Sequence, residues 1–209
     1  MQGFLQALEE QRWDDHRYYH HSTINQSLHA LSAVCFLCSY VLVFTSPAAA
    51  ALVGWLLAMV TRQTGHFFFE PKGYDEINQA THAHKEQIKV GYNLRRKQVL
   101  LTIWALSPLW LLVDPTLFGR YRPEPGLANF VERVSVLWLG IGAAALVFRS
   151  VQLCFIRDVR TGAVWLTKIL TDPFHDLMLY HRAPLAVLRG ELLEPAGARS
   201  ERAGEAGSR

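Results

Sequence analysis

The chain has 209 residues, of which half are hydrophobic and 19% are charged, and its formal net charge is +3. This composition fits either a membrane protein or a soluble domain with a sizeable core. No basic stripe with interleaved aromatic residues is visible, so nucleic acid is not an expected partner. The three cysteines do not make a disulfide framework, and we identify no secretory signal peptide before the first apolar run.

The N-terminal segment predicts an amphipathic helix lying on a membrane surface. Phe4, Leu5, Leu8 and Trp13 recur there at roughly helical spacing. Four longer apolar runs follow it in the chain. They are Leu28–Phe44, Ala48–Val60, Val99–Val113 and Val134–Phe148. Arg149, at the end of the fourth run, is expected to extend its charge toward the membrane surface.

These four runs predict membrane helices. Each is shorter than the roughly 20 residues that usually cross a bilayer, so a soluble bundle of buried helical hairpins is the alternative. However, a soluble helix would carry a polar stripe, whereas these runs are apolar on all faces. Tryptophans also lie within or near the ends of the runs, as interfacial aromatic residues do. We therefore expect an all-α fold, a polytopic membrane bundle of about four transmembrane helices with histidine-bearing cytoplasmic helices.

The charged residues predict the orientation of this bundle. With four crossings, all nine histidines fall on one side of the membrane. Arg120, Arg122 and Arg133 fall on the other side, and the remaining Lys and Arg residues lie with the histidines. The positive-inside rule assigns the basic side to the cytoplasm. The sequence thus predicts an integral membrane protein whose histidine-rich side is cytoplasmic.

The region after the fourth run predicts further short helices and a tail. Residues 164–170 form an amphipathic stretch, and Asp172-Pro173 is typical of a helix start. From Glu194 the sequence is almost entirely Ala, Gly, Glu, Arg and Ser, which is typical of disorder. We therefore expect a single membrane-embedded helical domain over residues 1–192 and a disordered tail over residues 193–209.

The first of three histidine-bearing segments runs from Tyr18 to His29. If it is helical, His21, Asn25 and His29 are spaced four residues apart and share one face. Two imidazoles on one helix face can chelate a single transition-metal ion, and Asn25 between them is suited to support a ligand from behind. We interpret His21 and His29 as metal ligands and His20 as a further candidate.

The second segment, Arg62–Glu70, follows the second apolar run. His66 and Glu70 are four residues apart, so both can face the bundle as a metal ligand and a catalytic carboxylate. Gly65 is expected to let a neighbouring helix approach closely. An alternative interpretation is interfacial anchoring by Phe67–Phe69, and the two are compatible because these phenylalanines cover other faces of the helix.

The third segment runs from Thr81 to Glu86. His82 and Glu86 form another pair at helical spacing, whereas His84 points about 200° away from His82. We interpret His82 as a metal ligand, with His84 and Glu86 supporting the site from behind; the alternative is a solvated helix face. The remaining histidines are assigned supporting or structural roles. They are His16, His175 and His181.

The first two segments also resemble a known family. YHHSTINQSLH and QTGHFFFE are similar to the paired motifs of the membrane iron(II)-dependent 2-hydroxy-fatty-acid dioxygenases, which act in fatty-acid α-oxidation, including breakdown of the phytosphingosine-derived chain in yeast. The residues that carry the resemblance are Tyr19, His20, His21, Asn25 and His29 in the first segment and Gln63, Gly65, His66 and Glu70 in the second.

The resemblance implies an iron(II) enzyme with O2 as co-substrate. Its reaction would shorten a 2-hydroxy fatty acid by one carbon, giving an aldehyde or an acid. One iron would be held by His21, His29 and His66, with His82 or a carboxylate completing the ligand set. We expect Arg62, Lys72 or Lys85 to meet the substrate carboxylate. Tyr19, Asn25 and Gln63 would support the ligands from behind.

Two other functions remain open at this point. A di-metal membrane hydroxylase or desaturase-like enzyme could use the pairs His66/Glu70 and His82/Glu86 together with the N-terminal histidines. A non-catalytic metal- or haem-binding membrane protein is the other candidate, in which haem would require histidines facing each other inside the bundle. Iron content and an absorption spectrum separate these alternatives from the mononuclear oxygenase.

Overall fold

The structure is a computed structural model that describes residues 3–70, 72–76, 78–122 and 124–194. Across these residues the chain is all-helical, as predicted. The only β-type pairing among them is two isolated bridges, Ser22 with Leu193 and Asp75 with Ala80.

Two helices form the N-terminal part and meet at a sharp break. Helix α1 spans Phe4–Tyr19 and helix α2 spans Thr23–Leu42. The break falls at residues 20–22, where the Ser22 side chain accepts a hydrogen bond from the Asn25 amide and so caps α2. The amphipathic leader helix is therefore present, but it does not continue into the first apolar run.

The second apolar run forms one continuous helical rod that changes its winding along its length. It consists of α3 (Pro47–Leu52), η1 (Val53–Met59), α4 (Val60–Thr64) and η2 (Gly65–Phe69), of which η1 and η2 are π-helical. We call this unit the 47–69 rod. Ser32 and Ser39 of α2 donate hydrogen bonds to rod carbonyls, those of Ala58 and Ala50 respectively, each at 2.8 Å. Such bonds hold the two units closely together.

A short helix precedes the third run. Helix α5 spans His82–Ile88, and α6 (Leu94–Leu106) continues through η3 (Ser107–Leu109) into α7 (Trp110–Val113). Asn93 caps α6 by accepting a hydrogen bond from the Arg96 amide at 3.1 Å.

The fourth run lies inside a much longer helix, α8, which spans the 30 residues Leu127–Ile156. Arg149, which follows the run, does not extend its charge toward a membrane surface as expected. Arg149 is 2% exposed, and its guanidinium donates hydrogen bonds to the carbonyls of Val90 and Gly91. It therefore fastens α8 to the segment between α5 and α6.

The next helix also corrects the sequence analysis. Residues 164–170 and the segment after Asp172-Pro173 belong to one helix, α9, which spans Val159–Tyr180 and contains Pro173. The helix begins at Asp158, whose side chain accepts a hydrogen bond from the Thr161 amide at 2.8 Å. Asp172 does not start a helix because the chain is already helical from Val159, and its carboxylate instead lies 2.7 Å from the Lys168 ammonium. A short helix, α10 (Ala183–Leu188), follows.

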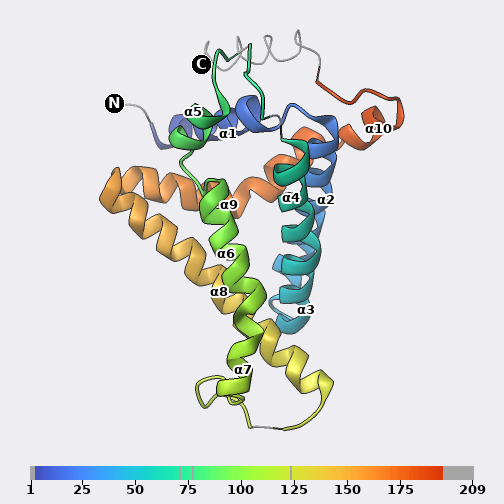
Figure 1. Ribbon diagram of the computed structural model, residues 1–209, viewed down its shortest axis with the longest axis vertical. Helices are drawn as coiled ribbons and strands as arrows, with labels where there is room; N and C mark the ends of the chain where they lie inside the picture. Colours follow the sequence, from blue (N-terminus) through green and yellow to red (C-terminus); the bar gives the residue numbers. More distant parts are fainter. Residues whose placement is uncertain (1–2, 71, 77, 123, 195–209) are drawn as a thin grey trace.

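Figure 1 shows how these elements are arranged. Helix α2 and the 47–69 rod run side by side along the long axis, with α6, α7 and α8 opposite them. Helices α1 and α9 cross the upper end of this group. The segments that carry the histidines gather at this end, and the loop between α7 and α8 lies at the other (Figure 1). The topology across a membrane, with the histidine-bearing end cytoplasmic, stays a prediction.

Two of the described helices are long and apolar enough to cross a membrane. They are α2, Thr23–Leu42, and α8, Leu127–Ile156. Helix α2 contains all but the last two residues of the first apolar run, and α8 contains the whole fourth run. The second and third runs are divided among shorter elements, so their crossing of a membrane stays a prediction.

The start of the predicted tail is packed against the N-terminal helices. Leu193 pairs with Ser22, and the Glu194 amide donates a hydrogen bond to the His21 carbonyl at 3.0 Å. These two residues are therefore ordered, because they satisfy backbone groups exposed at the break between α1 and α2. The rest of the predicted tail, residues 195–209, lies outside the described residues.

A buried ion pair fixes the segment between the rod and α5. Lys85 is 1% exposed, and its ammonium lies 2.8 Å from the Asp75 carboxylate and donates to the Tyr18 carbonyl at 3.3 Å. Burial opposes ionisation of Asp75, but hydrogen bonds from Lys85 and Asn78 outweigh it and lower the Asp75 pKa to about 2. The pair therefore ties this segment to the end of α1.

Replacing Asp75 by Asn should lower the free energy of unfolding by about 2 kcal/mol near neutral pH. Because the folded-state pKa lies below the ordinary value of 3.8, the ionised carboxylate stabilises the fold above about pH 4. The difference between the two proteins should shrink as the pH falls toward about 2. Unfolding in detergent at several pH values measures it, and the exposed neighbour Glu76→Gln serves as control. A pH-independent difference would contradict the assignment.

Candidate metal centre

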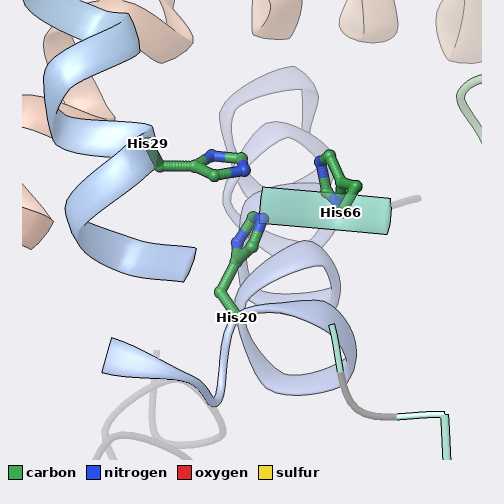
Figure 2. Close-up of side chains that lie close together, drawn as sticks. All are labelled: His20, His29 and His66. Atoms are coloured by element: carbon green, nitrogen blue, oxygen red, sulfur yellow. The ribbon is translucent and has the colours of Figure 1, made fainter. Parts of the chain in front are cut away.

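Three histidines converge at the upper end of the bundle, where α1, α2 and the 47–69 rod meet. One ligand nitrogen from each of His20, His29 and His66 lies within 4.8 Å of the others. The ring centroids are 4.1 Å apart for His20–His29, 5.4 Å for His20–His66 and 4.9 Å for His29–His66. Figure 2 shows the three rings pointing toward one another from separate parts of the backbone.

Each histidine owes its position to a different local feature. His20 lies in the break directly after α1, where its backbone is no longer helical. His29 lies in the second turn of α2 and is fully buried. His66 lies in the π-helical segment η2, where the wider winding changes the face on which a side chain emerges. Three unrelated backbone conformations thus bring the rings to one point.

The close approach of η2 to α2 depends on Gly65. A Cβ atom at this position would lie 2.1 Å from the Asn25 side-chain oxygen and 3.6 Å from the His29 ring. Asn25 is itself fully buried and donates a hydrogen bond to the Tyr19 carbonyl at 2.9 Å. The expected close packing at Gly65 is therefore present, and Asn25 also holds the break that carries His20.

Each ring has a polar group near its Nδ1 atom. The Tyr180 hydroxyl lies 3.0 Å from His20 Nδ1, and Glu70 lies 2.7 Å from His66 Nδ1. The Asp176 carboxylate lies 3.5 Å from His29 Nδ1. Outer groups of this kind fix the orientation and tautomer of a metal-binding imidazole and leave Nε2 for the ion.

The residues fit a transition-metal ion. Nε2 of His20 and Nε2 of His29 are buried and have no hydrogen-bond partner, although buried polar atoms normally have one. Burial, followed by the proximity of His29, lowers the pKa of His20 well below its ordinary value, so the ring stays in the neutral form that binds metals. Two nitrogens that each bind one ion at about 2.1 Å lie at most about 4.2 Å apart. The observed nitrogens lie within 4.8 Å of one another, so small rotations of the rings bring them to the distance that an ion requires.

Helix α9 supplies a buried polar row that the sequence analysis did not identify. Lys168, Asp172, Asp176 and Tyr180 follow one another at intervals of four residues and are all buried. Burial opposes ionisation of Asp176, but Arg62, at 2.7 Å, and then His29 lower its pKa, so it stays a carboxylate. The four-residue spacing was visible in the sequence and indicates one helix face. The predicted helix start at Asp172-Pro173 divided this face between two elements and so concealed the row.

His21 does not belong to the cluster. The expected face of His21, Asn25 and His29 does not form, because α2 begins only at Thr23. The His21 ring instead approaches the Arg17 carbonyl, and its Nε2 atom lies 3.9 Å from the Asp75 carboxylate. His20 takes the place expected for His21, whereas His29 and His66 lie in the cluster as expected.

Two of the three residues expected to meet a substrate carboxylate are already engaged. Lys85 is buried in its pair with Asp75. Arg62 lies 2.7 Å from Asp176 and 3.8 Å from Asp172. Lys72 is exposed at the rim of a small polar pocket beside His66. Existing ion pairs thus make Arg62 and Lys85 structural in this arrangement.

Two residues of the third segment line the small pocket. His82 and Glu86 line it together with His66 and Glu70. Among the described residues, however, only His20, His29 and His66 bring three ligand atoms within 4.8 Å of one another. Glu86 accepts a hydrogen bond from the Leu94 amide at 2.5 Å, and His84 is exposed. The structure therefore places this segment beside the cluster and not in it.

The other two supporting residues differ in their contacts. The Tyr19 hydroxyl donates a hydrogen bond to the Lys85 carbonyl at 2.6 Å, so it connects α1 with α5. The Gln63 amide lies 3.3 Å from the Met59 sulfur, and its side-chain oxygen is buried without a partner. His16, given a supporting role above, does approach the site: its Nδ1 atom lies 3.0 Å from the Tyr180 hydroxyl.

A scan against protein-family models and searches of curated protein sequences and of solved structures found no match to this chain. The site is therefore interpreted from its own geometry.

Replacing Gly65 by Ala should destabilise the protein by about 1–3 kcal/mol, because the added methyl group overlaps the Asn25 side chain. Separation of η2 from α2 should also weaken metal binding, since it moves His66 away from His29. Thermal unfolding in detergent and metal titration measure the two effects. Gly73→Ala is the matched control, because nothing lies within 4 Å of its added Cβ atom. Equal behaviour of the two variants would contradict this role of Gly65.

Proposed function

We propose that the chain is a membrane-embedded non-haem iron(II) oxygenase that cleaves 2-hydroxy fatty acids with O2. The observation that carries the proposal is the convergence of His20, His29 and His66 around two buried, unpartnered nitrogens. Three histidine ligands leave positions open for O2 and for a substrate. The resemblance of the two motifs to the membrane 2-hydroxy-fatty-acid dioxygenases provides the reaction.

When bound, iron(II) supplies the one-electron chemistry that activates O2. The protein's own contribution is to hold and orient the ligands. Tyr180 and Glu70 hydrogen-bond to Nδ1 of His20 and of His66, so Glu70 acts as a positioning residue in this arrangement. The Asp176 carboxylate lies 3.5 Å from Nδ1 of His29, near enough to favour one orientation of that ring. The Arg62 guanidinium balances the negative charge of Asp176, the carboxylate next to His29.

The proposed reaction balances without a separate reductant. With 2-hydroxypalmitate and O2, breaking the bond between C1 and C2 yields pentadecanoate, CO2 and water. All four electrons required to reduce O2 come from the substrate. If the product is instead the aldehyde pentadecanal, the balance requires CO2 and hydrogen peroxide. Product analysis therefore also determines how many electrons the substrate has supplied.

The geometry favours one iron ion over the alternatives. The described residues contain one group of three closely placed ligand atoms, whereas a di-metal enzyme needs two such groups. The three rings lie at 42° to 84° to one another and converge on one point, an arrangement that leaves no room for a porphyrin between two of them. A mononuclear site thus accounts for the geometry best.

Alanine variants of the three histidines test the metal site. Anaerobic titration of purified protein with iron(II) should give about one ion per chain for the wild type. His20→Ala, His29→Ala and His66→Ala should each lose most of this binding and all of the O2-dependent conversion of 2-hydroxypalmitate, because two remaining imidazoles hold an ion weakly.

Two further variants serve as controls for this experiment. His84→Ala removes an exposed histidine, and His21→Ala removes the neighbour of His20 that lies outside the cluster. Both should retain iron. Full iron content in His20→Ala, or its loss in His21→Ala, would contradict the ligand assignment. Iron binding without conversion of 2-hydroxypalmitate would disprove the proposed reaction and retain the site.

The surface of the bundle supports its proposed place in a membrane with four crossings. Large apolar side chains are exposed on α8, on the 47–69 rod and on α6–α7, and soluble proteins rarely expose so many together. Examples are Val147 and Phe148, Leu57 and Val60, and Ile103 and Leu112. We infer that lipid covers these faces and that the histidine-bearing end is cytoplasmic.

Single cysteines should report this topology. In a background in which Cys35, Cys38 and Cys154 are replaced by Ser, Gly73→Cys and Arg120→Cys place a thiol at opposite ends of the bundle. In intact cells a membrane-impermeant maleimide should label the cysteine at position 120 and should reach the one at position 73 only after permeabilisation. Labelling of both sites in intact cells would contradict four crossings.

A further inference from the structure

A large cavity lies between the helices and reaches the metal centre. Its volume is about 450 Å³, within the range of about 300–1,000 Å³ typical of small-molecule sites. It is bordered by α1, α2, the 47–69 rod, α6, α8 and α9. His20 and His66 form part of its wall, so a molecule in this cavity can contact the iron site directly.

Most of the cavity wall is apolar. Five of the six bordering units contribute the apolar side chains Phe36, Trp55, Leu101, Leu139, Leu146 and Ile169. An apolar chamber of this kind favours a hydrocarbon chain, because burying each CH₂ group contributes about 0.8 kcal/mol. The chamber is also bordered by the helices proposed to face lipid, so a membrane amphiphile can approach it from the bilayer.

Four cations line the cavity, and three of them have carboxylate partners. Arg62 pairs with Asp176 at 2.7 Å. Lys168 lies within 2.7 Å of the carboxylates of both Asp15 and Asp172. Lys89 lies 3.6 Å from Glu86 and over the Tyr19 ring.

Lys97 is the exception. Among the described residues no ion pair or hydrogen bond of its ammonium group is found. Glu70, which borders the same small pocket as Lys97, is engaged by His66. Burial, and then the nearby Lys89, lower the pKa of Lys97 well below its ordinary value, although Glu70 opposes this shift. A ligand carboxylate held by Lys97 would favour the ammonium form and supply the close anionic partner that no described residue provides.

We propose that Lys97 binds the carboxylate of a single long-chain fatty acid whose hydrocarbon chain occupies the cavity. This inference rests on the proposed function for its catalytic meaning, but it concerns binding and does not require iron. Lys97 and His66 border both the cavity and the small polar pocket, so a carboxylate on Lys97 places the adjacent carbon next to the histidines. Lys97 thus takes the role expected above for Arg62, Lys72 or Lys85.

Binding to the metal-free protein tests this inference. Trp55 and Trp165 line the cavity, so a brominated fatty acid bound there should quench tryptophan fluorescence. We use dibromostearate with protein treated with a chelator, in detergent. Lys97→Met should weaken binding roughly tenfold to a hundredfold, the range expected for a hydrogen bond to a charged group. Lys97→Arg, which keeps the charge, should retain most of the affinity.

Two comparisons keep the test decisive. Lys72→Met removes an exposed lysine at the rim of the small pocket and should leave binding unchanged. The wild-type protein should bind the brominated acid roughly tenfold more tightly than the matching brominated alcohol. This second comparison uses only the wild-type protein, so it does not depend on whether a variant folds. Equal binding of acid and alcohol, or equal affinity of Lys97→Met and wild type, would overturn the proposal.

The outcomes for iron and for fatty acid are separable. Tight binding of dibromostearate that depends on Lys97, together with absence of iron binding, supports the cavity proposal and rejects the oxygenase. Iron-dependent conversion of 2-hydroxypalmitate with an unchanged KM in Lys97→Met supports the oxygenase and rejects this role of Lys97.

Discussion

The close approach of η2 to α2 at Gly65 is the constraint on which the site depends. Because glycine lacks a Cβ atom, the Asn25 side chain fits against the rod, and the same contact sets the distance between His29 and His66. Asn25 also holds the Tyr19 carbonyl, which fixes the break that carries His20. One small residue thus controls the relative positions of three ligands that come from different backbone segments.

Charge balance is the second condition of this arrangement. Helix α9 brings Asp172 and Asp176 into the interior, and buried carboxylates are tolerated only with close cations. Arg62 from the rod and Lys168 from α9 itself supply them. The network leaves Asp176 ionised beside His29, whereas Lys97, which also lines the cavity, has no ion pair with any residue in the described part of the chain.

The two ends of the bundle differ in their proposed roles. The polar end, where α1 and α9 cross, provides the proposed reaction centre, and the helices below it enclose the space for a hydrocarbon chain (Figure 1). Placing both in one bundle would allow a membrane-derived acid to present its carboxyl end to the histidines while its chain stays away from water.

The sequence by itself determined the helical class, the four apolar runs, the pairing of His66 with Glu70 and the close packing at Gly65, because these follow from local periodicity and spacing. Tertiary structure alone decided between His20 and His21, since the choice depends on where α1 breaks and Ser22 caps α2. It likewise decided which lysine remains available to a substrate. Pairing of buried charges occurs between residues far apart in the chain, and no local pattern reveals which cation is left without a partner.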